Sequence, residues 1–110
     1  MEHAMPTLLQ IDFPMHGPWG EEMAVAFGDL AAVIGRSPGL RWKIWTENEE
    51  AGESGGIYLF EDRDSARTYL DEHLARLEGF GITDIRAKLF DVNEPLSYLN
   101  AGPIAQPTTA

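Results

Sequence analysis

Two side chains occupy positions in this sequence from which they could do acid–base chemistry. His73 is the only histidine inside a predicted regular element, on the apolar stripe of a helix, and its ordinary pKa near neutrality would suit a general base. Tyr58, in a predicted strand, carries a hydroxyl that can donate to a ligand oxygen. A structural role is the alternative for both: a hydrogen-bonded core or rim histidine, and a packed ring with a satisfied hydroxyl.

Aromatic rings offer surfaces on which a flat ligand could stack. Trp42 and Trp45 are three residues apart in one predicted strand, so they face opposite sides of the sheet. One of them should enter the core or a pocket within it, and the other should enter the opposite face. Trp19, in a Pro-Trp-Gly loop, could cover the mouth of a pocket. Phe27 and Tyr69, on two helical stripes, complete the candidate substrate-binding residues, and ordinary packing is the alternative throughout.

Polar residues near strand ends are further candidates. Asn48 could hold a ligand oxygen, although an amide near a turn more often stabilises the turn itself. Arg86 and Lys88 could stabilise an anion, or they could pair with Asp12 or Gln10, including across a subunit interface.

The composition argues against a metal site. The chain has no cysteine, which excludes thiolate ligands, cysteine nucleophiles and disulfides. His3 and His16 lie in a tail and a loop, and no histidine pair or histidine–carboxylate pair has ligand spacing. We therefore predict no metal.

The charge restricts the partners. A formal net charge of −10 argues against nucleic acid and against anionic membrane surfaces, and its simplest role is solubility. No apolar run approaches the roughly 20 residues that span a bilayer. The first residues have neither the basic region nor the apolar run of a signal peptide, so we predict a cytoplasmic protein.

Hydrophobic periodicity predicts the elements that position these residues. We expect strands over 7–13, 40–49, 55–61 and 82–92, helices over about 21–34 and 62–78, and a short final element over 96–99. The second and third strands form a hairpin, and Gly55-Gly56 at the start of the third strand indicates a close backbone crossing rather than a phosphate loop.

The order strand, helix, strand, strand, helix, strand predicts an α+β, ferredoxin-like fold, with a four-stranded antiparallel sheet and two helices on one face. A length of 110 residues fits one domain, which we place at residues 6–100. Residues 1–5 would be an N-terminal extension or a remnant of cloning, and residues 101–110 a flexible C-terminal tail.

The composition of the sheet face that the helices do not cover predicts a second protein subunit. On the helix side we expect Leu9, Ile11, Phe13, Ile57, Leu59, Ala87 and Leu89, and on the other side Leu8, Gln10, Tyr58, Phe60, Lys88 and Phe90. The second strand adds either Trp42 and Ile44 or Lys43 and Trp45 to that other side. A soluble monomer rarely exposes such a patch, so we predict a homodimer packed through the sheets; a monomer with a mixed, wet face is the alternative.

Four strings carry a family resemblance: "LLQIDF", "WKIWTENE", "GGIYLFED" and "KLFDVNEPLS". Over about residues 7–100 the chain resembles the YdhR-type family of mono-oxygenases. The resemblance implies a dimeric α+β barrel, in which two ferredoxin-like subunits join through their sheets. The same broad group contains antibiotic-biosynthesis mono-oxygenases, which oxidise polycyclic aromatic phenols without metal or flavin. The resemblance therefore implies a cofactor-independent mono-oxygenase of a small aromatic substrate.

Oxygenation without a cofactor needs an apolar slot, a proton acceptor and donors that hold an anion, because a phenol must lose its proton before it can reduce oxygen. We expect His73, Tyr58 and Asn48 as the catalytic residues. Haem ligation by His73 is a weaker alternative. The sequence is also compatible with a dimeric barrel that binds a small apolar ligand or serves a stress response without catalysis, and with a purely structural dimer.

Overall fold

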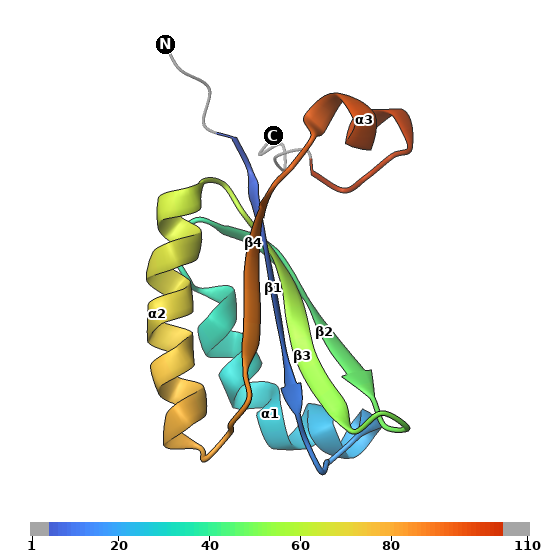
Figure 1. Ribbon diagram of the computed structural model, residues 1–110, viewed down its shortest axis with the longest axis vertical. Helices are drawn as coiled ribbons and strands as arrows, with labels where there is room; N and C mark the ends of the chain where they lie inside the picture. The colour runs from blue at the N-terminus through green and yellow to red at the C-terminus, as the bar shows by residue number, and fades with distance from the viewer. Residues whose placement is uncertain (1–4, 105–110) are drawn as a thin grey trace.

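The computed structural model describes residues 5–104, and its strands and helices follow the predicted order (Figure 1). The elements are β1 (Thr7–Pro14), α1 (Gly20–Gly35), β2 (Leu40–Asn48), β3 (Glu53–Phe60), α2 (Arg63–Gly79), β4 (Arg86–Asp91) and α3 (Glu94–Leu99). No helix within the described residues is both long enough and apolar enough to cross a membrane.

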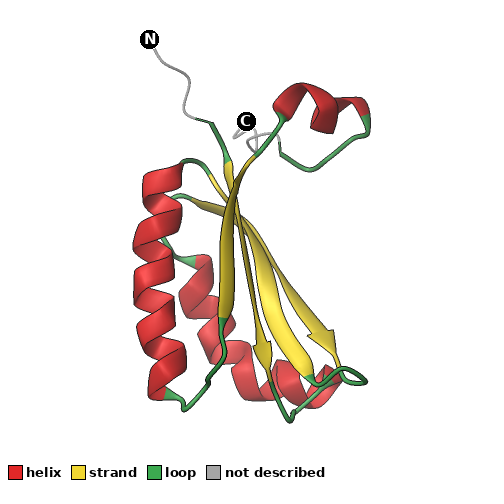
Figure 2. Cartoon of the chain, in the orientation of Figure 1, coloured by secondary structure: helices red, strands yellow, loops and turns green. Residues whose placement is uncertain are grey.

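The four strands form one antiparallel sheet in the order β2-β3-β1-β4. Helix α1 connects β1 to β2 and α2 connects β3 to β4, and both helices lie on the same face of the sheet (Figures 1 and 2). This arrangement confirms the ferredoxin-like α+β fold. We call the opposite side the helix-free face; it carries the side chains of Leu8, Gln10, Asp12, Trp42, Ile44, Ile57, Leu59, Arg86, Lys88 and Phe90.

Local sequence explains where α2 starts and which side it buries. The side chain of Asp62 accepts a hydrogen bond from the backbone N–H of Ser65 at 2.8 Å, which satisfies one of the free donors at the helix start. The predicted apolar stripe is the buried one, with Ala66, Tyr69, His73 and Leu77 all inside.

The expected orientation of β3 was wrong. Leu9, which is buried under the helices, pairs directly with Tyr58, so Tyr58 and its alternate neighbour Phe60 face the helices. Ile57 and Leu59 therefore lie on the helix-free face. Apolar residues occupy both faces of β3, so alternation could not choose between them. The choice follows from packing, because the ring of Tyr69 lies 5.0 Å from that of Tyr58 and 5.4 Å from that of Phe60.

The register of β2, which the sequence left open, follows from its pairing with β3. Lys43 pairs with Tyr58, and Trp45 pairs with Gly56. Lys43 and Trp45 therefore lie on the helix side, whereas Trp42 and Ile44 lie on the helix-free face. The two tryptophans do serve opposite faces.

The close backbone crossing expected at the glycine pair is confirmed. A Cβ atom on Gly55 would collide with the carbonyl oxygen of Ile11 and would lie 2.8 Å from Cα of Asp12. A Cβ atom on Gly56 would lie 2.7 Å from Cε of Lys43. The first glycine thus lets β1 and β3 approach, and the second leaves space for a side chain of β2.

β4 begins at Arg86 rather than at the predicted Ile82. Asp84 has a φ of 55°, which a strand cannot accommodate. Ile82 and Ile85 still pack against the core from this turn, so the apolar pattern was recognised but the backbone conformation was not.

The C-terminal segment returns to β2. Helix α3 lies beyond the end of the sheet at which β4 stops (Figure 1). After it, the indole N–H of Trp42 donates to the Pro103 carbonyl at 2.7 Å, Arg41 donates to the Ile104 carbonyl at 2.8 Å, and Ile104 is buried. Residues 1–4 of the expected extension and 105–110 of the expected tail lie outside the described residues.

Candidate functional site

A small hollow lies between the sheet and the two long helices. We call it the inner pocket; its volume is about 40 Å³. All of these elements contribute to its walls, which include Phe13, Met23, Phe27, Leu30, Lys43, Trp45, Tyr58, His73 and Leu77. A water molecule needs roughly 10–15 Å³ by this kind of measure, so the pocket admits a few waters but not an aromatic ring.

A larger groove of about 320 Å³ lies on the other side of two aromatic side chains. We call it the outer groove; α1 and β2 form it, and Met23, Phe27 and Trp45 line both hollows. The rings of Phe27 and Trp45 stack with centroids 6.2 Å apart and planes 15° apart. This stacked pair therefore forms part of the partition between the inner pocket and the outer groove.

His73 accepts a hydrogen bond from Arg76 in this environment and is poorly suited to act as a base. Arg76 Nη1 lies 3.0 Å from His73 Nδ1, and a guanidinium can only donate, so Nδ1 accepts and the ring proton is on Nε2. Burial, with the nearby charges of Lys43 and Arg76, lowers the pKa of His73 to about 3. The ring is therefore neutral at physiological pH, and its basic lone pair is already engaged.

Two tyrosines pack around His73. Burial raises the pKa of Tyr58 far above its ordinary value, so its hydroxyl stays protonated and can only donate to an anion. Burial also raises the pKa of Tyr69 to about 12. The ring of Tyr69 stacks on that of His73, with centroids 5.1 Å apart, and it also packs against the ring of Tyr58. Tyr69 does not line the inner pocket.

Lys43 is a pocket residue that sequence reasoning did not single out. Its Nζ lies 3.5 Å from the ring centroid of Trp45 and 4.6 Å from that of Tyr58. Within the described residues it makes no hydrogen bond or ion pair. Burial, followed by the charge of Arg76, lowers its pKa to about 7. The sequence did contain a signal for this position: Lys43 is two residues from Trp45 in one strand, and residues two apart in a strand share a face of the sheet.

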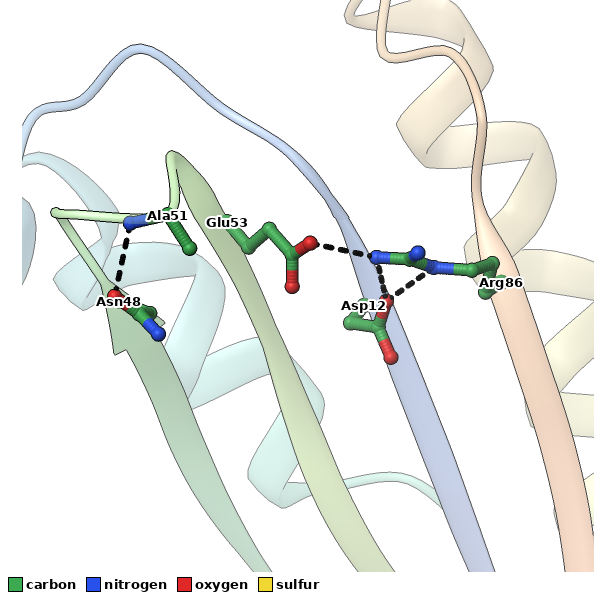
Figure 3. A network of polar contacts seen from close by, with 5 residues as sticks. All are labelled: Asp12, Asn48, Ala51, Glu53 and Arg86. Carbon is green, nitrogen blue, oxygen red and sulfur yellow. Dashed lines mark hydrogen bonds and ion pairs between the residues drawn. The ribbon is translucent and has the colours of Figure 1, made fainter.

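The remaining predicted residues lie elsewhere. Asn48 accepts a hydrogen bond from the backbone N–H of Ala51 at 3.0 Å, which stabilises the hairpin turn (Figure 3). Trp42 lies on the helix-free face, and Trp19 directly precedes α1. None of these three side chains lines the inner pocket or the outer groove. Four of the eight candidates, Phe27, Trp45, Tyr58 and His73, do line the inner pocket.

A charged network crosses the helix-free face near the hairpin turn (Figure 3). Arg86 Nε donates to Asp12 Oδ1 at 2.6 Å, and a terminal nitrogen of Arg86 donates to Glu53 Oε1 at 3.0 Å. Arg86 thus pairs within its own chain with Asp12, which is one of its two predicted partners. This network lies on the other side of the sheet from the inner pocket.

Comparison with known proteins gives one family. The model of the family described as "Putative mono-oxygenase ydhR" matches residues 8–103. No curated protein matches the sequence. Among solved structures, a mutant of SnoaB from Streptomyces nogalater, described as a cofactor-independent oxygenase, is 22% identical. The similarity covers 82% of this chain and 95% of that chain with a TM-score of 0.59, and it shows a shared fold.

Proposed function

The chain belongs to the ydhR family, and from that premise we propose that it is a cofactor-independent mono-oxygenase of a small aromatic phenol or quinol. The observation that carries the proposal is the inner pocket, in which aromatic rings from α1, β2 and β3 surround the polar ends of Lys43 and His73. SnoaB, which shares the fold, is described as a cofactor-independent oxygenase, and this likeness supports the same class of reaction.

The proposed reaction balances without a cofactor. A phenol with a C–H group para to its hydroxyl is oxidised to a quinone. One oxygen atom of O₂ enters the ring at that carbon, and the other is released as water. The substrate supplies the electrons, and it can do so only after it loses the phenolic proton. Tyr58 and His73 Nε2–H would donate hydrogen bonds to the resulting oxyanion, and Phe27 and Trp45 would contact the ring face.

Substrate entry requires the two hollows to join. Pockets for small molecules usually measure about 300–1,000 Å³, which the inner pocket does not reach but the outer groove does. Because Phe27 and Trp45 lie between the two, a rotation of either ring would connect them. A flat ligand could then lie with its ring in the outer groove and its hydroxyl at the polar end of the inner pocket.

Oxygen uptake tests the proposed function. Purified protein treated with a chelator would be mixed with a panel of naphthols, hydroquinones and polycyclic phenols, and consumption of O₂ and formation of the quinone would be followed. We expect uptake above the protein-free blank for at least one compound. A full panel without uptake, together with no ring-shaped ligand bound, would remove the proposal.

A non-catalytic binding protein is the second candidate. This candidate is favoured by the hydrogen bond from Arg76 to Nδ1 of His73, because this bond occupies the lone pair with which His73 could act as a base. In this case an aromatic ligand would bind without oxygen uptake, and its affinity would not change in His73→Ala.

We also propose that two copies pack through their helix-free faces. Ile44 and Phe90 on this face are 54% and 43% exposed, more than a stable monomer usually leaves in water when such residues cluster. The face also carries polar groups: Arg86 pairs with Asp12 and Glu53 near the hairpin turn, and Gln10 and Lys88 lie in the row that contains Ile57 and Ile44. The cytoplasmic location and the domain limits at residues 6 and 100 stay predictions.

A further inference from the structure

We propose that Lys43 is the proton acceptor of this site: its amine takes the hydroxyl proton from a bound phenol, and the ammonium so formed holds the phenolate. This inference rests on the proposed class of ligand. It assigns the basic role to a residue outside the expected catalytic set of His73, Tyr58 and Asn48, and it can be tested without turnover.

The position of the amine is the first observation. Nζ of Lys43 lies between the rings of Trp45 and Tyr58, at 3.5 Å and 4.6 Å from their centroids, and the side chain lines the inner pocket. A ring that entered beside Trp45 would therefore lie close to the amine. Lys43 and Trp45 are two residues apart on β2, so the strand places both side chains on the same face of the sheet.

The second observation is the space made for this side chain. Lys43 packs over Gly56, and a Cβ atom there would lie 2.7 Å from Cε of Lys43 and 3.2 Å from the Tyr58 ring. A Cβ atom at this position would displace the end of the lysine chain, so Gly56 leaves the room that the chain occupies. The amine is thus directed along the sheet into the pocket instead of toward solvent.

The third observation is the set of groups that face the amine. Helix α2 contributes His73 to the inner pocket, and the charge of Arg76 acts on the amine from the same helix. Strand β3 contributes Tyr58, and α1 contributes only apolar side chains. No carboxylate lines the inner pocket among the described residues. An ammonium here has no counter-ion, which is why burial and Arg76 lower the pKa of Lys43 to about 7.

These surroundings make the amine a base and then an electrostatic partner. Near neutral pH a large share of the Lys43 side chains is unprotonated, so a lone pair is available. The O–H bond of the phenol breaks, an N–H bond forms at Nζ, and the electron pair stays on the phenolate oxygen. The pocket keeps the same net charge, and the new ion pair attracts strongly because little water separates its members.

A chromogenic phenol tests the proposal in the absence of oxygen. 4-Nitrophenol absorbs visible light only as the phenolate, so its ionisation on binding can be read directly from the spectrum. Under anaerobic conditions and at a pH where the free probe is mainly neutral, we expect wild-type protein to increase the phenolate absorbance. The ionisation constant of the bound probe should rise about tenfold or more.

The variants separate a local base from overall charge. Lys43→Met should bind the probe without the increase in phenolate absorbance, whereas Arg67→Met, which removes one exposed positive charge from α2, should behave as wild type. Circular dichroism would verify that both variants fold. If Lys43→Met does not fold, the wild-type titration still tests the proposal, because a probe that binds in its neutral form contradicts it.

Three results would overturn the proposal: a wild-type protein that does not bind the probe, one that binds it in the neutral form, and a Lys43→Met variant that retains the absorbance increase. Failure of the mono-oxygenase proposal has another signature. Anaerobic ionisation that depends on Lys43, combined with no oxygen uptake by any phenol, would remove the oxygenase and leave the role of Lys43 standing.

Discussion

At the level of single residues, the contact between His73 and Arg76 changes what the histidine can do. A helical histidine on an apolar stripe could be a base, a ligand or a packed core residue. Arg76, one turn further along α2, donates to Nδ1 at 3.0 Å and leaves only the Nε2–H free to act. The basic role therefore passes to a different side chain, Lys43, which lies on the sheet.

The lowered pKa of His73 has a consequence for stability. The pKa falls from 6.5 to about 3 on folding, so between these values the unfolded chain binds more protons than the folded one. The free energy of unfolding should therefore fall as the pH drops below 6.5. Between pH 7 and pH 5 the loss from this residue amounts to about 2 kcal/mol.

Urea unfolding of wild type and His73→Gln at pH 7 and pH 5 measures this effect. The carboxylates contribute equally in both proteins, so the difference between their acid losses isolates the histidine. We expect the wild type to lose about 2 kcal/mol more than the variant. Equal losses in the two proteins would mean that His73 is accessible to protons in the folded state.

At the level of elements, the approach of β1 to β3 depends on Gly55. In Gly55→Ala the added methyl group would collide with the Ile11 carbonyl, and the two central strands would have to separate. We expect a loss of about 2–4 kcal/mol in the free energy of unfolding, measured with urea. Gly79→Ala is the matched control, because a Cβ atom meets nothing within 4 Å at that helix end, and it should change stability by less than about 1 kcal/mol.

The contact between α1 and β2 controls access to the inner pocket. Phe27→Ala removes one ring of the partition, so the inner pocket and the outer groove should join. We expect 1-naphthol to bind faster than in wild type, as followed by quenching of tryptophan fluorescence in stopped flow, with a stability cost of about 2 kcal/mol. Val33→Ala, on the same helix but outside both hollows, should leave the rate unchanged. A Phe27→Ala rate equal to that of wild type would show that ligands enter by another route.

At the level of the whole molecule, the exposed apolar side chains of the helix-free face predict dimerisation. Ile44→Glu places a charge on the exposed apolar part of the proposed interface, and in sedimentation velocity it should weaken the dimer at least tenfold. Val25→Glu, at a residue 86% exposed on α1, adds the same charge elsewhere and should leave the dimer intact. A wild-type monomer at all concentrations would contradict the proposal.

Salt should strengthen this dimer. Each chain carries a formal net charge of −10, so two copies repel each other at low ionic strength. Screening reduces this repulsion, and the apolar contact remains. We expect the dissociation constant to decrease as sodium chloride is raised, in the same sedimentation experiment. A dimer that weakens with salt would indicate an interface held by ion pairs instead.

The amino-acid sequence by itself determined the element order, the fold and the hairpin, because these depend on local periodicity. The stripe of α2 and the alternation of Leu9, Ile11 and Phe13 are each readable within a few residues. The buried position of His73 followed from the same kind of pattern, as did the separation of Trp42 and Trp45 onto opposite faces.

Only the tertiary structure decided which groups meet at the site. The faces of β3 could not be distinguished, because Ile57 and Leu59 are as apolar as Tyr58 and Phe60. That orientation depends on strand pairing and on the space beside Tyr69, both of which involve residues distant in sequence. The same pairing brings Lys43 over Gly56 and beside Tyr58, and so creates a half-buried amine that local patterns do not reveal.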